Sequence, residues 1–450
     1  MAGNIDAEPT SNVRRAASLK MKRIVVLGGG FGGMYCARHL ERLLKRRRDV
    51  EITLVSRDNF FLFTPMLHEV AASDLDITHI VSPLRALLTR TTVLVGEVQS
   101  IDLQRRVVTA SHGQSPHQHD LEFDQLVIAL GSTTNFFGIR GLEHRALTMR
   151  TLGDAIHLRN RVIGMLEEAE SEEPSASDGL LTFVVAGGGF AGVETIAAIN
   201  DFVREALRFY KRLSPERLRL VLVHAGPEIL PELGPELGEY ARRKLTARGV
   251  EILVNTGVAD VDSDAVVLRD GRRIPSRLVV WTAGTSPHHL LRSLPCPLER
   301  GRICVNETLA VPGWPGVWGV GDCAVVPDRR TGRPHPPTAQ HALREARTAA
   351  RNIVAVLDGR RTETFNFRTI GQLAAIGRRT GVARMLGWNF SGFIAWWLWR
   401  TIYLTKLPRL DRKVRVAIDW TLDLVFAKDF VQFLAERADA MSTEAIEHAD

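Results

Sequence analysis

Two stretches of the sequence, Lys22–Gly33 (KRIVVLGGGFGG) and Leu180–Gly192 (LLTFVVAGGGFAG), repeat one pattern. Each is an apolar run that ends in glycines spaced G-x-G-x-x-G and leads into a helix-forming segment. The first glycine of this motif makes a tight turn, the second lets a pyrophosphate approach the backbone, and the third lets the helix pack on the strand. The repeat therefore predicts two dinucleotide sites in an α/β fold with two Rossmann-like domains.

The spacing of the repeats sets the expected domain organisation. We expect residues 21–150 and 286–365 to form one interrupted domain and residues 151–285 to form a second domain inserted into it. Residues 1–20 mix charges with small polar residues and contain no apolar core, so we read them as a disordered lead-in and not as a signal peptide. Residues 366–450 contain five of the eight tryptophans and form a separate C-terminal region.

Several residues are candidates for cofactor binding. The two turns contribute Gly28, Gly30, Phe31, Gly32 and Gly33, and Gly187, Gly189, Phe190 and Gly192. Two further strand-like runs end in glycine, which is typical where backbone approaches a cofactor; these add Gly131, Ala283 and Gly284.

An acid that binds the ribose usually follows the second strand of each unit. After the first such strand come Ser56, Arg57 and Asp58, and after the second comes His224. Asp58 or Ser56 is left to contact the first ribose. The second site has no acid at the usual position, but no Arg or Lys closely follows His224 to bind a 2′-phosphate. Two sites suggest a resident FAD and a visiting nicotinamide, and NADH is favoured over NADPH.

The C-terminal region has the pattern of a helix that lies in a membrane interface. Met385–Trp399 has no charge, and as a helix it would be about 22 Å long, too short for a bilayer core of about 30 Å. Basic residues follow at 406–415. A second apolar face then recurs at helical spacing, in Val414, Ala417, Ile418, Thr421, Leu422, Val425 and Phe426. We favour a monotopic anchor and leave open a helix packed on its own core or on a partner in a homodimer.

With these residues in view, the chain resembles the type II, non-proton-pumping NADH:quinone oxidoreductases of the pyridine nucleotide-disulfide oxidoreductase superfamily, over about Lys22 to Phe430. Blocks beyond the glycine turns carry the resemblance: 59–67, which includes Pro65; 280–284; 317–322; 337–342; and 392–396. The resemblance implies an FAD-dependent enzyme that passes electrons from NADH to ubiquinone or menaquinone. It implies peripheral attachment to the cytoplasmic face of the cell inner membrane.

The resemblance also implies residue roles. Gly321 and Asp322 match the motif that contacts the ribityl chain of the flavin. Ala339 and Gln340 match the segment that places a helix end beside flavin and quinone, and Glu194 matches a position near the nicotinamide. We take Glu194 and Gln340 as the catalytic candidates. The family commonly has a second Gln four residues after the first, whereas this chain has Arg344.

Alternative functions follow from the same motifs. Disulfide or sulfide chemistry needs cysteines beside the flavin, but Cys36, Cys296, Cys304 and Cys323 show no C-x-x-C spacing. A reductase of a soluble iron–sulfur partner would share both dinucleotide sites but would not need the tail. A flavin-containing redox sensor is the non-enzymatic alternative. The net charge of +7 comes without an aromatic-interleaved basic motif, so we expect no nucleic-acid partner, and no metal site is expected.

Overall fold

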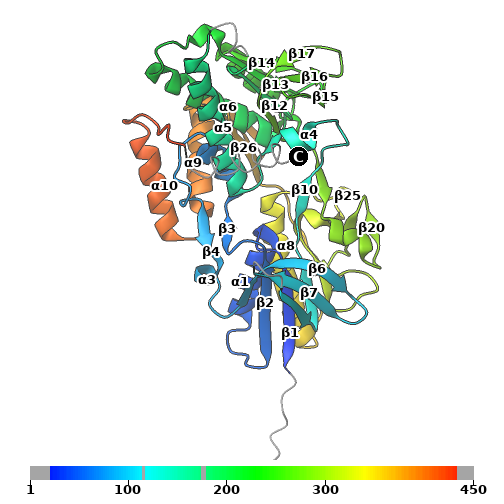
Figure 1. Cartoon of the computed structure of the whole chain (residues 1–450). Coiled ribbons are helices and arrows are strands. Elements are labelled where there is room, and N and C mark those ends of the chain that lie inside the picture. Colours follow the sequence, from blue (N-terminus) through cyan, green and yellow to red (C-terminus); the bar gives the residue numbers. More distant parts are fainter. Residues whose placement is uncertain (1–20, 114–116, 174–178, 433–450) are drawn as a thin grey trace, which may run out of the picture.

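Two parallel sheets stand one above the other and each is covered by helices, with the C-terminal helices along one flank (Figure 1). The computed structural model describes residues 21–113, 117–173 and 179–432. The expected disorder of residues 1–20 lies outside these ranges. The α/β class and the two Rossmann-like units expected from the glycine repeat are confirmed.

The first sheet joins strands from both ends of the chain. All its neighbouring strands are parallel. Its order is β22 (Val317–Gly319), β9 (Gln125–Ile128), β1 (Lys22–Leu27), β2 (Val50–Ser56) and β5 (Thr92–Val95). Because β22 lies beside β9, the chain returns to this sheet after it has built the second one.

The second sheet is made only from the intervening segment. It is also parallel throughout. Its order is β11 (Leu147–Thr148), β18 (Val279–Trp281), β12 (Thr182–Ala186), β13 (Arg219–Val223) and β14 (Val250–Leu253). β12 is buried at all five positions, as expected for a strand covered on both faces.

Helices follow the strands as the hydrophobic pattern predicts. The longer ones are α1 (Phe31–Leu43), α5 (Leu152–Ser171), α6 (Phe190–Ala206), α7 (Pro235–Ala247) and α8 (Ala339–Leu357). α1 and α8 pack against each other, and α6 packs on β12 and β13. α1 and α6 each begin directly at a glycine turn.

Smaller elements complete the two halves. The short helices are α2 (Leu67–Ala71), α3 (Leu84–Leu87) and α4 (Leu142–Arg145). The smaller sheets are β3 (Phe60–Leu62) with β4 (Val81–Pro83); β6 (Glu97–Asp102), β7 (Val107–His112) and β8 (His117–Glu122); β10 (Ser132–Thr134) with β19 (Thr285–Pro287); β15 (Val258–Val261), β16 (Ala265–Leu268) and β17 (Arg273–Pro275); β20 (Leu298–Glu299), β21 (Arg302–Cys304) and β23 (Ala324–Val325); and β24 (Pro327–Asp328) with β25 (Arg333–Pro334).

The C-terminal region begins with an antiparallel sheet and not with a helix. β26 (Gly371–Ala375), β27 (Gly381–Met385) and β28 (Trp388–Ser391) precede α9 (Gly392–Lys406) and α10 (Leu410–Leu422). The expectation that Met385–Trp399 forms one helix is therefore wrong, because Gly387 (φ 90°) turns the chain between two paired strands. Within the described residues, no helix is long and apolar enough to span a bilayer.

A buried carboxylate fixes the loop between α3 and β5 to α1. Glu41 accepts hydrogen bonds from the backbone N–H groups of Arg90 (2.7 Å) and Thr91 (2.7 Å) and from the Thr91 hydroxyl (2.9 Å). Its residue is 9% exposed. Since buried N–H groups left without an acceptor destabilise a fold, this side chain holds the loop in place.

We expect Glu41→Ala to lower the free energy of unfolding by about 2–4 kcal/mol, because it leaves several buried N–H and O–H donors without an acceptor. Chemical denaturation followed by circular dichroism measures the change. Glu51→Ala, which removes an exposed carboxylate from β2 of the adjacent sheet, is the control. Equal stability of the two variants would contradict this role for Glu41.

Candidate functional site

The carboxyl edge of the first sheet gathers most of the residues expected to bind the first dinucleotide. Gly28 follows β1, Ser56 ends β2, Gly131 follows β9 and Gly321 follows β22. In a parallel sheet these strand ends lie at one edge, where ligands of open α/β folds bind. Segments nearly 300 residues apart in the sequence thus meet at one crevice.

The first glycine turn has room for a phosphate at one position only. A Cβ on Gly33 would overlap the Gly28 carbonyl oxygen, and one on Gly28 (φ 104°) would overlap that of Ala129. A Cβ on Gly30 would meet no protein atom within 4 Å. The first helical bond of α1 runs from Met34 N to Gly30 O (3.0 Å), so the N–H groups of its first turn have no acceptor within the helix. Open space beside free N–H groups fits a pyrophosphate. We call this turn, from Gly28 to Gly33, the first cradle.

The aromatic block after β2 braces this turn. The ring of Phe31 lies edge-on to that of Phe61, with centroids 5.0 Å apart. Pro65 lies half-buried in a single 3-10 turn, Thr64–Met66, between β3 and α2. Gly32 packs its backbone near Val320, where an added Cβ would come within 3.1 Å of a methyl group.

Of the three candidates after β2, only Ser56 is part of the glycine turn. Ser56 is 6% exposed, and its hydroxyl lies where a Cβ on Gly29 would be. Arg57 and Asp58 are exposed. Ser56 is thus placed as a cradle residue, while Asp58 can reach a ribose only from the solvent side.

Asp322 lies in a small polar network that the sequence did not reveal. Its carboxylate accepts from the Ser132 hydroxyl (3.1 Å), and the Arg150 guanidinium donates to the Ser132 carbonyl (2.6 Å). Burial raises the pKa of Asp322. Ser132 and Arg150 come from separate segments, and no motif marks them.

The second glycine turn, from Gly187 to Gly192, has the same geometry as the first and is called the second cradle. A Cβ on Gly192 would overlap the Gly187 carbonyl oxygen, whereas one on Gly189 would have Glu232 Oε1, at 4.0 Å, as its nearest contact. Val193 N bonds to Gly189 O at 3.0 Å. Phe190 packs against the core. Ala283 and Gly284 follow β18 at the same sheet edge.

His224 supports the turn itself. Its Nδ1 accepts a hydrogen bond from the Gly188 N–H at 3.0 Å, so the ring is neutral with its proton on Nε2. Burial is the main cause that lowers the pKa of His224. The acid near this cradle is Glu232 instead, in the 3-10 turn Pro231–Leu233. Sequence reasoning missed Glu232 because it lies beyond the strand end where the acid is usually found.

Gln340 lies in the first turn of α8, with Thr338 as the N-cap residue. The Gln340 amide donates to the Gly371 carbonyl on β26 at 3.1 Å. Arg344, at the position of the missing second Gln, donates to the Gln340 carbonyl (2.8 Å) and stacks over Phe367. Arg344 therefore supports the helix start that presents Ala339 and Gln340.

Glu194 is buried where α6 meets β26 and α9. Its Oε1 accepts from the Ala375 N–H and from the Trp399 indole N–H, both at 3.1 Å. Burial raises its pKa to about 8. β26 thus contacts Gln340 at one end, through Gly371, and Glu194 at the other, through Ala375. The two catalytic candidates, 146 positions apart by the numbering, lie along one short strand.

Two of the four cysteines are poorly placed for thiol redox chemistry. All four are free. Cys36 and Cys323 are completely buried, and burial raises the pKa of each thiol to about 12. Because the thiolate is the reactive form, burial disfavours redox chemistry at both thiols near neutral pH.

Comparison with known proteins agrees with this geometry. Residues 22–346 match the family model described as pyridine nucleotide-disulphide oxidoreductase, and residues 370–429 match the NDH2 C-terminal domain. The chain is 34% identical over 432 residues to the type II NADH:quinone oxidoreductase Ndh of Mycobacterium tuberculosis, covering 92% of this chain and 89% of that protein. It is 33% identical over 406 residues to the demethylphylloquinone reductase NdbB of Synechocystis, covering 88% and 95%. The fold matches the structure of NDH2 from Plasmodium falciparum in complex with NADH, with a TM-score of 0.84 at 19% identity, covering 91% and 99%.

Two glycine variants separate folding from cofactor binding. We expect Gly30→Ala to fold normally but to lose most of its flavin, because its Cβ enters the space reserved for the phosphates. Gly33→Ala should instead destabilise the protein by about 2 kcal/mol or more, since its Cβ overlaps backbone. Flavin absorbance and thermal unfolding of the flavin-free proteins measure both. A Gly30→Ala protein with full flavin content would contradict the assignment.

Proposed function

Because the chain belongs to the type II NADH:quinone oxidoreductases, which transfer hydride from NADH to FAD and two electrons on to a quinone without pumping protons, we propose that its two cradles bind one dinucleotide each. The first cradle takes FAD and the second takes NADH. The proposed boundaries are 21–150 and 286–365 for the FAD domain, 151–285 for the NADH domain and 366–450 for the membrane-associating region.

The assignment of the two cradles rests mainly on Asp322 and Gly321. They lie at the edge of the first sheet only, and they match the motif that contacts a ribityl chain. FAD, when bound there, would supply the chemistry that accepts the hydride of NADH and passes its two electrons to the acceptor. The protein's part is to position the rings: the N–H groups at Gly30 and Gly189 hold phosphates, and the first turn of α8 directs its positive end to the reacting region.

Gln340 and Glu194 form the proposed reacting region. The Gln340 amide is held by Gly371, and Glu194 is held by Ala375 and Trp399. Both polar groups therefore keep a fixed direction along β26. We assign Gln340 to orientation of the quinone ring and Glu194 to the nicotinamide side of the site. Whether ubiquinone or menaquinone is used is decided by comparing turnover with each.

The wild-type protein tests the proposal directly. We expect a yellow preparation that oxidises NADH faster than NADPH when a water-soluble quinone is supplied. A colourless protein would contradict the FAD assignment. Reduction of a soluble iron–sulfur protein in preference to quinone would favour the alternative reductase.

Gln340→Ala is expected to lower quinone-dependent kcat/KM by roughly tenfold or more, because the quinone loses an orienting hydrogen bond. The loss corresponds to about 1.4 kcal/mol or more of transition-state stabilisation. Flavin content should stay unchanged. Turnover with ferricyanide, which needs no quinone site, should also be retained. Gln118→Ala, an exposed substitution on β8, is the control. Parallel loss of flavin and quinone turnover would count against this role.

The exposed face of α10 is the proposed membrane contact. Leu410 is 76% exposed, Val414 50% and Ile418 51%, while Val416 and Trp420 on the opposite face are buried. The neighbouring α9 exposes Phe393, Ile394 and Trp397. A contiguous apolar face of this kind, beside basic residues, suits an anionic lipid surface. Since the respiratory substrate NADH is cytoplasmic, we place the protein on the cytoplasmic face of the inner membrane.

The triple variant Leu410→Ser, Val414→Ser, Ile418→Ser is expected to weaken vesicle binding by about a hundredfold, because it removes roughly 3 kcal/mol of apolar burial. Co-sedimentation with anionic vesicles measures the loss, and ferricyanide turnover should persist. Point variants are preferable to truncation because α9 contributes Trp399 to the core. Leu43→Ser with Val356→Ser, exposed apolar residues of α1 and α8, is the control. If vesicle binding persists and the protein instead becomes monomeric, the face joins two copies in a homodimer.

A further inference from the structure

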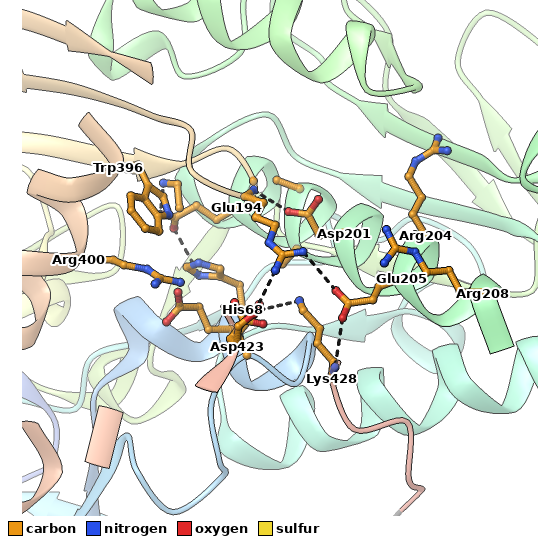
Figure 2. A pocket seen from close by; sticks show the side chains of 17 residues that line it. His68, Glu194, Asp201, Arg204, Glu205, Arg208, Trp396, Arg400, Asp423 and Lys428 are labelled. Atoms are coloured by element: carbon orange, nitrogen blue, oxygen red, sulfur yellow. Dashed lines mark hydrogen bonds and ion pairs between the residues drawn. The ribbon is translucent and has the colours of Figure 1, made fainter. Parts of the chain in front are cut away.

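A polar cavity of about 240 Å³ lies on the side of Glu194 that faces α2 and the C-terminal segment (Figure 2). Glu194, His68 and Glu69 line its buried end. Arg208 and Arg378, which are exposed, line the other end. At about 30 Å³ per water molecule the cavity has room for several waters. It therefore joins the buried glutamate to the solvent-exposed surface.

Two carboxyl groups at the buried end are poised to hold protons. Burial raises the pKa of Glu69 to about 8, the same value as that of Glu194. Glu69 accepts a hydrogen bond from the Trp420 indole at 3.0 Å. The neighbouring Asp74, whose pKa burial also raises, pairs with the buried Lys428 ammonium at 2.6 Å. Near neutral pH, Glu69 and Glu194 are both largely protonated.

The cavity wall also contains polar atoms that need water. Within the described residues, His68 Nε2 and Arg400 Nε are buried without a hydrogen-bond partner. Burial lowers the pKa of His68 to about 3, so its ring is neutral, and its Nδ1 lies 3.8 Å from Glu194 Oε2. Buried polar groups of this kind are normally satisfied by ordered water. Water would link Glu69, His68 and Glu194.

The established reaction requires a proton from the aqueous side. Hydride transfer supplies two electrons and one hydrogen, whereas the quinol formed from a quinone carries two hydrogens. One proton is therefore taken up for each NADH oxidised with quinone. Ferricyanide differs, because one NADH reduces two ferricyanide ions and releases a proton.

We propose that this cavity is the entry route for that proton, with Glu69 as the relay that reloads Glu194 from water. The inference rests on the proposed function and adds the path by which its proton arrives. Glu194 belongs to the proposed reacting region and is held by Ala375 of β26, while Glu69 lines the buried end of the same cavity beside Trp420. Each relay step breaks one O–H bond and forms another, so no further reactant is needed.

The groups that face Glu69 come from every element around the cavity. Arg400 and Lys428 favour its charged form and Asp74 opposes it. The charged and titratable residues that line the cavity are His68 and Glu69 on α2, and Asp74 after it; Glu194, Asp201, Arg204 and Glu205 on α6; Arg208 in the 3-10 turn Leu207–Phe209; Arg378; Arg400 on α9; Asp423; and Lys428. Asp201 and Glu205 lie near Arg378 at the mouth, which leaves Glu69 and Glu194 as the inner protonated pair.

Glu69→Gln is the decisive variant. We expect quinone-dependent turnover near pH 7 to fall roughly tenfold or more, with flavin content and ferricyanide turnover unchanged and with a larger solvent deuterium isotope effect. The difference from wild type should shrink above pH 8, where Glu69 in the wild type loses its proton. A purely structural defect would give a pH-independent ratio and would overturn the proposal. Glu69→Asp, which keeps a titrating carboxyl, should restore part of the turnover, and Glu239→Gln on the exposed surface of α7 is the control.

Two further measurements test the same route in case Glu69→Gln does not fold. Ala198→Leu fills the cavity from α6 without changing charge, and we expect the same selective loss of quinone turnover. Infrared titration should show a protonated carboxyl signal that disappears near pH 8 in wild type and that is smaller in Glu69→Gln, where only Glu194 of this pair still contributes. If Ala198→Leu turns over quinone normally, or if the infrared signal of Glu69→Gln is as large as that of wild type, the route is wrong. Failure of the wild type to oxidise NADH with quinone would instead refute the proposed function.

Discussion

The close approach of Gly33 to the carbonyl oxygen of Gly28, which leaves no space for a Cβ, is the constraint on which the structure depends, and Gly192 approaches Gly187 in the same way. It lets a helix begin directly where a strand ends, so the N–H groups of the first helical turn face the sheet edge. No side chain fits between the two backbones. The same close approach leaves open space at Gly30, and cofactor phosphates are the group that such space and such donors suit.

The second organising feature is the way the C-terminal region packs on both halves. β26 contacts Gln340 through Gly371 and Glu194 through Ala375, and α9 buries Trp399 against Glu194. The apolar face of α10 is turned outward while Trp420 is turned inward to Glu69. The C-terminal region therefore packs on both halves with its inner side and leaves the apolar face of α10 exposed on its outer side. Its helices α9 and α10 lie along one flank of the molecule (Figure 1).

Expectations from the sequence succeeded where a residue's role is local and failed where it depends on distant neighbours. The strands before both glycine turns and the shared helical face of Val414 and Ile418 follow from periodicity alone, and both are observed, whereas only the structure shows that this face is exposed. The helix expected from Met385 was wrong because strand pairing between β27 and β28 outweighs the apolar run. Glu232 was missed because its distance from the second cradle is set by a turn, not by a fixed spacing.

The sequence by itself determined the duplicated strand–turn–helix units, and hence the fold class and the two cofactors, because glycine spacing and hydrophobic period are local properties of the chain. Only the tertiary structure decided which polar groups meet. Glu69 and Glu194 belong to separate segments, and their shared cavity and raised pKa values exist only once α2, α6 and the C-terminal region exclude bulk water around them. Burial is a property of the assembled fold, and desolvation acts on a carboxyl group only after that burial is complete.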